Sequence, residues 1–167
     1  MLKQVRHDGK EMQELSFRDA TPDDLPLIVA LLDDDELSRG REDPSLPLDP
    51  RYLTALEAID ADPNQRLIVA ERDGRIVGTM QLTIIPGIAF HGAWRGQIEA
   101  VRIASDLRGQ GLGGVMIDWA VAQCRARGCR LVQLMSMRDR LDAHRFYEKR
   151  GWKKSHYGFK LQIEEAQ

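Results

Sequence analysis

Four glycines lie within six residues beside an arginine, in the segment Arg108–Gly114 (RGQGLGG). Glycine has no Cβ, so a ligand can approach the backbone of such a segment closely. The amides at the start of a helix have no intrahelical acceptor, and the helix dipole adds positive potential there. A turn of this kind between a strand and a helix is suited to bind phosphate, with Arg108 adding a charge-assisted contact. A merely flexible turn is the alternative interpretation.

Two familiar phosphate-binding patterns do not fit this segment. The P-loop needs Gly-Lys-Ser/Thr after its glycines, whereas this chain continues Gly113-Gly114-Val115. The dinucleotide pattern G-x-G-x-x-G is present from Gly109 to Gly114, but its fingerprint includes an acid near the end of the following strand. The next predicted strand, LVQLM over 131–135, contains no acid. A nucleotide hydrolase and a nicotinamide or flavin enzyme are therefore disfavoured.

Cysteines and histidines are too few, and too unsuitably spaced, to indicate a metal site or a disulfide framework. The chain has two cysteines and four histidines. Cys124 falls within an apolar helical pattern, which predicts a buried and inert thiol. We therefore expect no metal and a reducing, cytoplasmic environment.

The elements that position the glycine turn follow from periodicity and turn residues. A strand is predicted over 15–18. Thr21-Pro22-Asp23-Asp24 then opens a helix with an apolar stripe at Leu25, Ile28, Val29 and Leu32. A proline-bearing acidic loop over 33–49 precedes a second helix from Asp49-Pro50, whose inward residues are Leu53, Leu56 and Ile59. A hairpin is predicted over 66–85, turning at Asp73-Gly74.

The second half of the chain predicts an alternation of strands and helices around the turn. After a connection over 86–96, the expected elements are a strand over 97–104, a helix over 112–127 ended by Gly128, a strand over 130–135, a helix over 139–149, and one or two closing strands over 152–163. The strand–helix–strand unit over 97–135 is expected to pair in parallel. The fold class is therefore α/β with a mixed sheet.

Length and composition indicate one ordinary globular domain. The chain has 167 residues, of which 43% are hydrophobic and 30% charged, and its net charge is −2. This balance gives no reason to expect nucleic acid or a membrane as partner. Basic residues nevertheless concentrate from Arg102 to Lys160 and acids before Glu71, so the second half can serve an anionic ligand. No signal peptide or membrane-spanning stretch is evident.

Three segments together resemble one family. Arg108-x-x-Gly111-x-Gly113 resembles the Q/R-x-x-G-x-G/A signature of the GCN5-related N-acetyltransferase (GNAT) superfamily. Val101-Arg102-Ile103 looks like the family strand that pairs with the pantetheine arm of coenzyme A. The segment over 143–152 (AHRFYEKRGW) looks like A-x-x-F/L-Y-E-K-x-G-F/W. About residues 15–160 follow the family plan.

The resemblance implies a single domain over 1–167, with its core over about 15–163, built on a central mixed, mostly antiparallel twisted sheet with helices on both faces. It implies an acetyl-CoA-dependent N-acetyltransferase, a small-molecule or amino-acid-like primary amine as acceptor, direct attack in a ternary complex, and a homodimer. The implied cofactor-binding residues are Val101, Arg102, Ile103, Arg108, Gly109, Gln110, Gly111, Leu112, Gly113, Gly114, Ser136, His144 and Tyr147.

Tyr147 matches the family tyrosine that protonates the departing thiolate, a role that suits a phenol because its pKa of about 10 keeps it protonated at neutral pH. Glu99, on the strand beside the expected reaction centre, is the candidate base, and His91 is its rival. Many members have asparagine at the position of Arg140, so whether Arg140 or Ser136 replaces that contact stays open. The first two predicted helices, the acidic loop over 33–42 and the connection over 86–96 are expected to select the acceptor.

The sequence is also compatible with two other functions. One is a non-catalytic acyl-CoA-binding sensor or regulatory module on the same fold. The other is an enzyme that acetylates a protein N-terminus or lysine.

Overall fold

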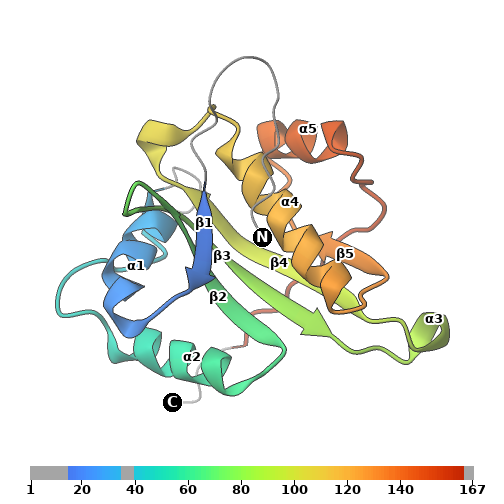
Figure 1. The fold of residues 1–167 in the computed structure, drawn as a ribbon, viewed down its shortest axis with the longest axis horizontal. Coiled ribbons are helices and arrows are strands. Elements are labelled where there is room, and N and C mark those ends of the chain that lie inside the picture. Colours follow the sequence, from blue (N-terminus) through green and yellow to red (C-terminus); the bar gives the residue numbers. More distant parts are fainter. Residues whose placement is uncertain (1–14, 35–39, 164–167) are drawn as a thin grey trace. The chain divides into compact units, whose positions relative to one another are not determined.

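The computed structural model describes residues 15–34 and 40–163, and its contacts divide the chain into two compact units, 1–133 and 134–167. Described elements of the first unit are β1 (Ser16–Asp19), η1 (Pro22–Asp24), α1 (Leu25–Asp33), α2 (Pro50–Ala61), β2 (Gln65–Arg72), β3 (Arg75–Ile85), α3 (Ala89–Gly92), β4 (Arg95–Ile103), η2 (Ser105–Leu107), α4 (Leu112–Ala126) and β5 (Leu131–Leu134), whose last residue begins the second unit (Figure 1). The second unit also contains α5 (Leu141–Lys149).

The five strands form one open sheet in the order β1-β2-β3-β4-β5. Pairs β1/β2, β2/β3 and β3/β4 are antiparallel, and the sheet as a whole is mixed. The β2–β3 hairpin turns at Asp73 and Gly74, both with positive φ (52° and 75°), as a two-residue hairpin loop requires. The predicted mixed, mostly antiparallel sheet is confirmed.

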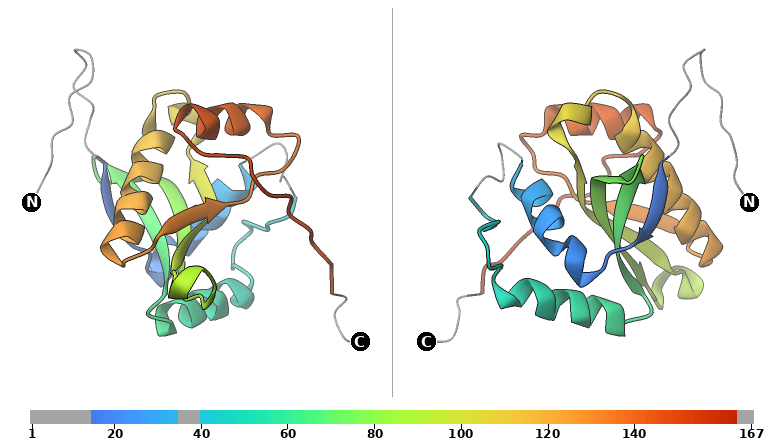
Figure 2. Two further views of the ribbon diagram at one scale, coloured as in Figure 1. Left: turned by 90° about the vertical axis from the view of Figure 1, so that its right-hand side faces the viewer. Right: turned by 60° about the vertical axis from the view of Figure 1, so that its left-hand side comes forward.

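Helices cover both faces of this sheet, which also confirms the sequence prediction (Figure 2). On one face α1 buries its apolar stripe, and Ile28 packs with Ala20 and Val69. On the other face lies α4, whose Trp119 stacks on Phe17 of β1 at 4.7 Å between ring centroids.

Two glycines let α4 lie close to the sheet. A Cβ on Gly96 of β4 would stand 2.2 Å from the Cys124 sulfur, and one on Gly78 of β3 would stand 2.8 Å from the Arg102 carbonyl oxygen and 2.9 Å from the Met116 sulfur. No side chain fits at these distances, so both glycines are required by the packing. Met116 and Cys124 are fully buried, which confirms the predicted burial of Cys124.

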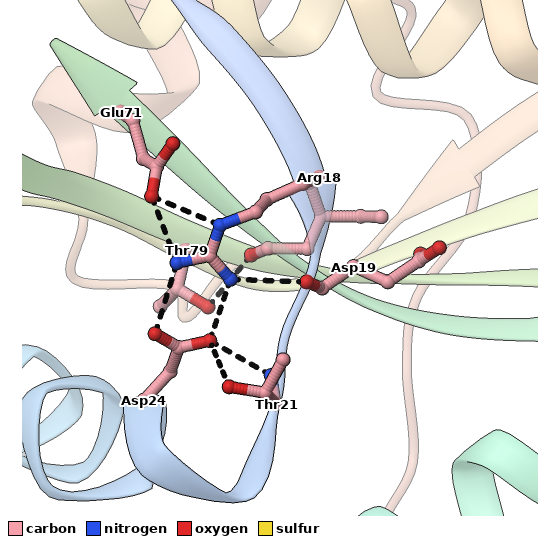
Figure 3. A network of polar contacts seen from close by, with 7 residues as sticks. Arg18, Asp19, Thr21, Asp24, Glu71 and Thr79 are labelled. Carbon is pink, nitrogen blue, oxygen red and sulfur yellow. Dashed lines mark hydrogen bonds and ion pairs between the residues drawn. The ribbon is translucent and has the colours of Figure 1, made fainter. Parts of the chain in front are cut away.

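A polar network ties the start of α1 to the sheet (Figure 3). Arg18 of β1 donates to both carboxylate oxygens of Asp24 at 2.6 and 3.0 Å and to Glu71 of β2 at 2.9 Å. Thr21 donates its amide and hydroxyl to the same carboxylate, at 2.7 and 2.9 Å. Hydrogen bonding from Arg18 lowers the pKa of Asp24 to about 2, although its side chain is largely buried. The Thr21 hydroxyl thus serves the buried carboxylate rather than acting alone as a cap.

Several predicted details are wrong. Leu53 of α2 is 41% exposed, whereas Leu56 is buried as predicted. Strand β4 begins at Arg95 rather than at 97, because Gly96 pairs with Ile84 of β3. The predicted closing strands over 152–163 are absent, since those described residues belong to no helix or strand. Helix α5 begins at Leu141 with Arg140 at its N-cap, two residues later than predicted.

Candidate active site

The glycine turn joins the end of β4 to the start of α4, with η2 between them. Gly109 and Gly111 have φ of 77° and 82°, in the left-handed region that glycine adopts without strain. A Cβ at either position would find nothing within 4 Å. The turn therefore needs glycine for its backbone conformation, and the space beside it is open for a ligand.

The backbone amides of this turn are available to an anion. Among the described residues, no amide from Gly109 to Gly113 donates to another backbone group, whereas the Gly114 amide bonds to the Gly111 carbonyl at 3.0 Å. The amides of Leu112 and Gly113 begin α4, a helix of 15 residues whose dipole favours negative charge at this end. The turn has the donor set that a phosphate or pyrophosphate needs.

Arg108 does not extend freely toward that space. Its Nε donates to the Ile103 carbonyl at 3.2 Å, and its Nη2 donates to the Asp34 carbonyl and lies 3.3 Å from the Asp34 carboxylate. Arg108 thus anchors the turn to the ends of β4 and α1, a role that the sequence did not predict. It still contributes positive charge beside the amides.

Two further arginines support the turn from the tip of the β2–β3 hairpin. Arg72 donates to the Gln110 side chain at 3.3 Å, and Arg75 forms a two-point ion pair with Asp106 at 2.8 and 3.0 Å. Sequence reasoning missed both residues, since 34 or more positions separate them from the glycines and no local pattern links the two segments.

A β-bulge interrupts β4 where the reaction centre is expected. Gln81 of β3 faces Glu99 and Thr79 faces Arg102, so β4 carries one extra residue between these pairs. Ala100, at the bulge, has φ of 53°, which costs a non-glycine residue roughly 1–2 kcal/mol. Bulges of this kind redirect backbone groups and concentrate next to functional sites. The predicted residues Glu99 and Val101–Ile103 therefore lie on both sides of an irregularity that releases backbone groups from regular pairing.

Glu99 belongs to a row of polar side chains that crosses β2 to β5 on the face carrying α1. We call this the polar row: Gln65, Gln81, Thr83, Gln97, Glu99 and Gln133. The Gln81 amide donates to Gln65 at 3.1 Å, and the Gln133 amide donates to Gln97 at 2.7 Å. In the sequence, polar residues alternate with other residues at Gln81 and Thr83 and again at Gln97 and Glu99, which indicates one polar face on each strand. The sequence prediction used this signal only for Glu99.

His91, the rival base, lies in α3 within the β3–β4 connection, exposed and with φ of 60°. It precedes the first residue of β4, whereas the glycine turn follows the last. The nine residues of β4 separate them by about 30 Å at 3.3 Å per residue. Glu99 lies within β4, between these two ends.

The second unit holds the remaining predicted residues. Tyr147 is half-buried on α5, in edge contact with Phe146 and Trp152 at 5.1 and 5.8 Å between centroids. The His144 ring nitrogen lies 2.9 Å from the Met137 carbonyl, so this predicted cofactor ligand also has a local structural partner. The Ser136 hydroxyl is inaccessible and has no hydrogen-bond partner among the described residues, which leaves its bonding capacity unused.

Neither cysteine suits a nucleophilic role. Burial raises the pKa of Cys124 to about 11 and also raises the pKa of Cys129, so both thiols stay protonated at neutral pH. In the described ranges, no three histidine, cysteine or acidic side chains are grouped as metal ligands. No helix in those ranges is both long and apolar enough to cross a membrane.

Comparison with known proteins places these features in one family. The acetyltransferase (GNAT) family model matches residues 16–152. A curated relative from Salmonella typhimurium, named aminoalkylphosphonate N-acetyltransferase, is 32% identical over 159 residues, which are 95% of this chain and 97% of the relative.

Solved structures share the fold over nearly the whole chain. One from Bacillus halodurans, described as a transcriptional regulator, is 43% identical with a TM-score of 0.86, covering 90% of this chain and 100% of that one. Another from Clostridium acetobutylicum, described as a predicted acetyltransferase with acetyl-CoA, is 19% identical with a TM-score of 0.67 and covers 89% of this chain and 96% of that one.

Proposed function

Because the chain belongs to the acetyltransferase (GNAT) family and is an N-acetyltransferase, we propose that it moves an acetyl group from acetyl-CoA to the primary amine of a small or amino-acid-like molecule. The observation that carries the proposal is the row of backbone amides from Gly109 to Gly113 without backbone partners. The pyrophosphate of coenzyme A is the anion they would bind, aided by the dipole of α4.

The bulge in β4 supports the placement of the pantetheine arm. Val101–Ile103 lie between the bulge and the turn, so an arm leaving the pyrophosphate along β4 reaches Ala100 and Glu99 next. Backbone groups released by the bulge are donors and acceptors for the amides of that arm. A donor aimed at the thioester oxygen in this way typically contributes roughly 2.7–4 kcal/mol to catalysis.

We place the acceptor over the polar row, with Glu99 taking the proton from the attacking amine directly or through a water molecule. Gln97 and Gln81 flank Glu99 along and across the strands, so their amides can hold a polar acceptor beside it. Direct attack within a ternary complex is supported by the raised pKa values of both thiols, which disfavour an acyl-cysteine. Tyr147 would return a proton to the coenzyme A thiolate.

Aminoalkylphosphonates are the first acceptors to test, because the curated relative is named for them. The experiment measures free-thiol release from acetyl-CoA with aminoalkylphosphonates, amino acids, other small amines and peptide N-termini. We expect turnover with one class of small amine, and Glu99→Gln should lower kcat for it. Turnover with peptides alone would instead identify a protein acetyltransferase.

One observation favours a second function, namely the description of the 43% identical structure as a transcriptional regulator. Tight binding of acetyl-CoA without turnover on any amine would support a regulatory module and overturn the acceptor proposal.

We also propose how the enzyme is organised, in its number of domains, its oligomeric state and its location. We treat both compact units as one catalytic domain, since the family match over 16–152 runs through both. We also propose a homodimer that works in the cytoplasm, where the free thiols of Cys124 and Cys129 stay reduced.

A further inference from the structure

A small cavity lies beside the last turn of α4, on the face of the sheet opposite to the polar row. Its volume is about 60 Å³, and we call it the end cavity. Its lining includes Asn64, Arg66, Leu82, Ile84, Gln123 and Arg127, all of which belong to the first compact unit. Leu82 and Ile84 alternate along β3 with Gln81 and Thr83 of the polar row, and alternate side chains of a strand point to opposite faces.

The end cavity is also distant from the glycine turn. That turn precedes Leu112, whereas Gln123 and Arg127 stand at the other end of α4. A helix of 15 residues is roughly 22 Å long at 1.5 Å per residue. None of the lining residues is among the predicted catalytic or cofactor-binding residues. The end cavity is therefore separate from the candidate active site.

The floor of the end cavity is apolar and its volume is small. Leu82 and Ile84 are only 2% and 4% exposed. One water molecule needs roughly 10–15 Å³ of such space, so a cavity of about 60 Å³ has room for roughly four to six water-sized groups. A ligand that replaces this water has to be small, and it needs an apolar part to cover the floor.

Two guanidinium groups line the same cavity, and one of them lacks a counter-ion. Arg127 donates to the Pro63 carbonyl at 3.1 Å and to the Asn64 side-chain oxygen at 2.9 Å, which are both neutral acceptors. Within residues 15–34 and 40–163, no carboxylate forms an ion pair with Arg127. The end cavity therefore has an uncompensated positive charge at its rim.

Arg66 adds a second cation at a fixed position. Its guanidinium lies 5.6 Å from the centre of the Trp119 ring, and its Nε donates to the largely exposed carboxylate of Asp19 at 2.7 Å. Its contact with the Gln123 side-chain oxygen is long, at 3.4 Å. A guanidinium has five N–H donors, so Arg66 and Arg127 both have donors left for a further acceptor.

We propose that the end cavity binds a small aliphatic carboxylate. Its oxygens accept charge-assisted hydrogen bonds from Arg66 and Arg127, and its alkyl part covers Leu82 and Ile84. The carbonyl end of α4 adds negative potential here, so a single negative charge is better matched than the double charge of phosphate. Propionate, with five non-hydrogen atoms, suits the volume, and we expect it to bind with roughly millimolar affinity.

Titration with propionate tests the proposal through the side-chain Nε–Hε NMR signals of the arginines. The signals of Arg66 and Arg127 should shift and saturate. Propionamide lacks the charge and inorganic phosphate lacks the apolar part, so each should bind there roughly tenfold or more weakly. No saturable shift with propionate, or tighter binding of phosphate or propionamide, overturns the proposal.

A matched pair of variants separates the end cavity from general attraction to a basic surface. Arg127→Gln should weaken propionate binding roughly tenfold or more. Arg125→Gln removes the same charge from an exposed position in the last turn of α4, outside the cavity, and should leave the binding nearly unchanged. Equal weakening in the two variants overturns the proposal.

Thermal unfolding shows that each variant is folded and gives a second readout. Propionate should raise the Tm of wild type and Arg125→Gln by mass action, with a much smaller rise for Arg127→Gln. The same rise in all three proteins overturns the assignment to the end cavity.

This inference goes beyond the acetyltransferase function and does not depend on it. Coenzyme A, titrated separately, should shift the Nε–Hε signals of Arg75 and Arg108 beside the glycine turn, which reports the proposed cofactor function by itself. Propionate that shifts only these two signals would bind at the glycine turn, which overturns the proposal for the end cavity.

Discussion

The guanidinium of Arg108 is committed to protein partners, so the anion-binding capacity of the turn resides mainly in its backbone amides. Arg108 bonds the Ile103 carbonyl and Asp34, and Arg75 is paired with Asp106. These exposed ion pairs contribute little to stability by themselves. Their effect is to fix where the amides point, which decides the affinity of a site made of main-chain donors.

Tyr147→Phe is the smallest change that removes the proposed proton donor, because the variant loses one oxygen and keeps the ring contacts with Phe146 and Trp152. We expect kcat to fall by roughly 10²-fold or more, in the usual range for general acid catalysis, with the KM for acetyl-CoA nearly unchanged. Steady-state kinetics on the best amine measure both. Wild-type turnover in this variant would remove Tyr147 from the mechanism.

Asp24→Asn tests the polar network of Figure 3 through its pH dependence. The folded pKa of about 2 lies below the ordinary value of 3.8, so the unfolded chain binds more protons between these values. The carboxylate therefore stabilises the fold above pH 4, by about 1–2 kcal/mol after allowance for the partly exposed Arg18, and this contribution disappears as the pH falls toward 2.

Urea unfolding at pH 7, 5, 4 and 3 checks the expectation. The stability difference between wild type and Asp24→Asn should be largest at pH 7 and should shrink below pH 4. The exposed neighbour Asp23→Asn is the control and should show little difference at any pH. An equal deficit of Asp24→Asn at every pH would contradict the assignment.

Among the elements of the first unit, β4 and α4 provide most of the candidate site. Strand β4 supplies Glu99, the bulge and the end from which the glycine turn departs, and α4 supplies the dipole. Contact between them depends on Gly96, where β4 comes so close to Cys124 that a methyl group cannot be accommodated. A change in this packing therefore moves the turn relative to the strand.

Gly96→Ala should destabilise the protein by roughly 1–3 kcal/mol through overpacking against the Cys124 sulfur. Cys124→Ala removes that sulfur, so the double variant should be more stable than the sum of the single effects predicts. Denaturant unfolding of the four proteins gives the coupling as a double-mutant cycle. Additive effects would show that the close approach is not maintained in solution.

Gly111→Ala should damage the phosphate turn, because φ of 82° is unfavourable with a side chain. We expect a stability loss of roughly 1–2 kcal/mol and a KM for acetyl-CoA raised roughly tenfold or more, the effect of losing one hydrogen bond to a charged group. Gly128→Ala, with φ of 76° at the other end of α4, is the matched control. This control should lose similar stability with an unchanged KM for acetyl-CoA. An equal rise of KM in Gly111→Ala and Gly128→Ala would contradict the role of the turn in binding.

For the whole molecule, binding of coenzyme A should stabilise the folded state by mass action. At one hundred times its Kd, a ligand that binds only the folded protein adds about 2.7 kcal/mol. For a chain of this size that is a rise in Tm of roughly 5–10 °C. Thermal unfolding with coenzyme A should show this rise, whereas pantetheine, which lacks the pyrophosphate, should give a much smaller one. Equal rises in Tm with the two ligands would show that the glycine turn contributes little to the binding of coenzyme A.

The sequence by itself determined the parts of this protein whose signals are local. The glycine spacing over 109–114, the Asp73-Gly74 hairpin and the apolar stripe of α1 each depend on neighbours a few residues away, so the turn, the hairpin and the helix were predicted at nearly their observed positions. The α/β class with a mixed sheet followed from the order of those elements.

Only the tertiary structure decided which distant residues meet. Arg72 and Arg75 reach the turn, Gln81 faces Glu99, and Gly96 is pressed against Cys124, because strand register and helix packing bring together positions that no short pattern relates. The segment over 157–163 shows the same limit. Its alternation of apolar and polar residues predicts a strand, but a strand forms only beside an edge that pairs with it, and residues 157–163 belong to no strand in the structure.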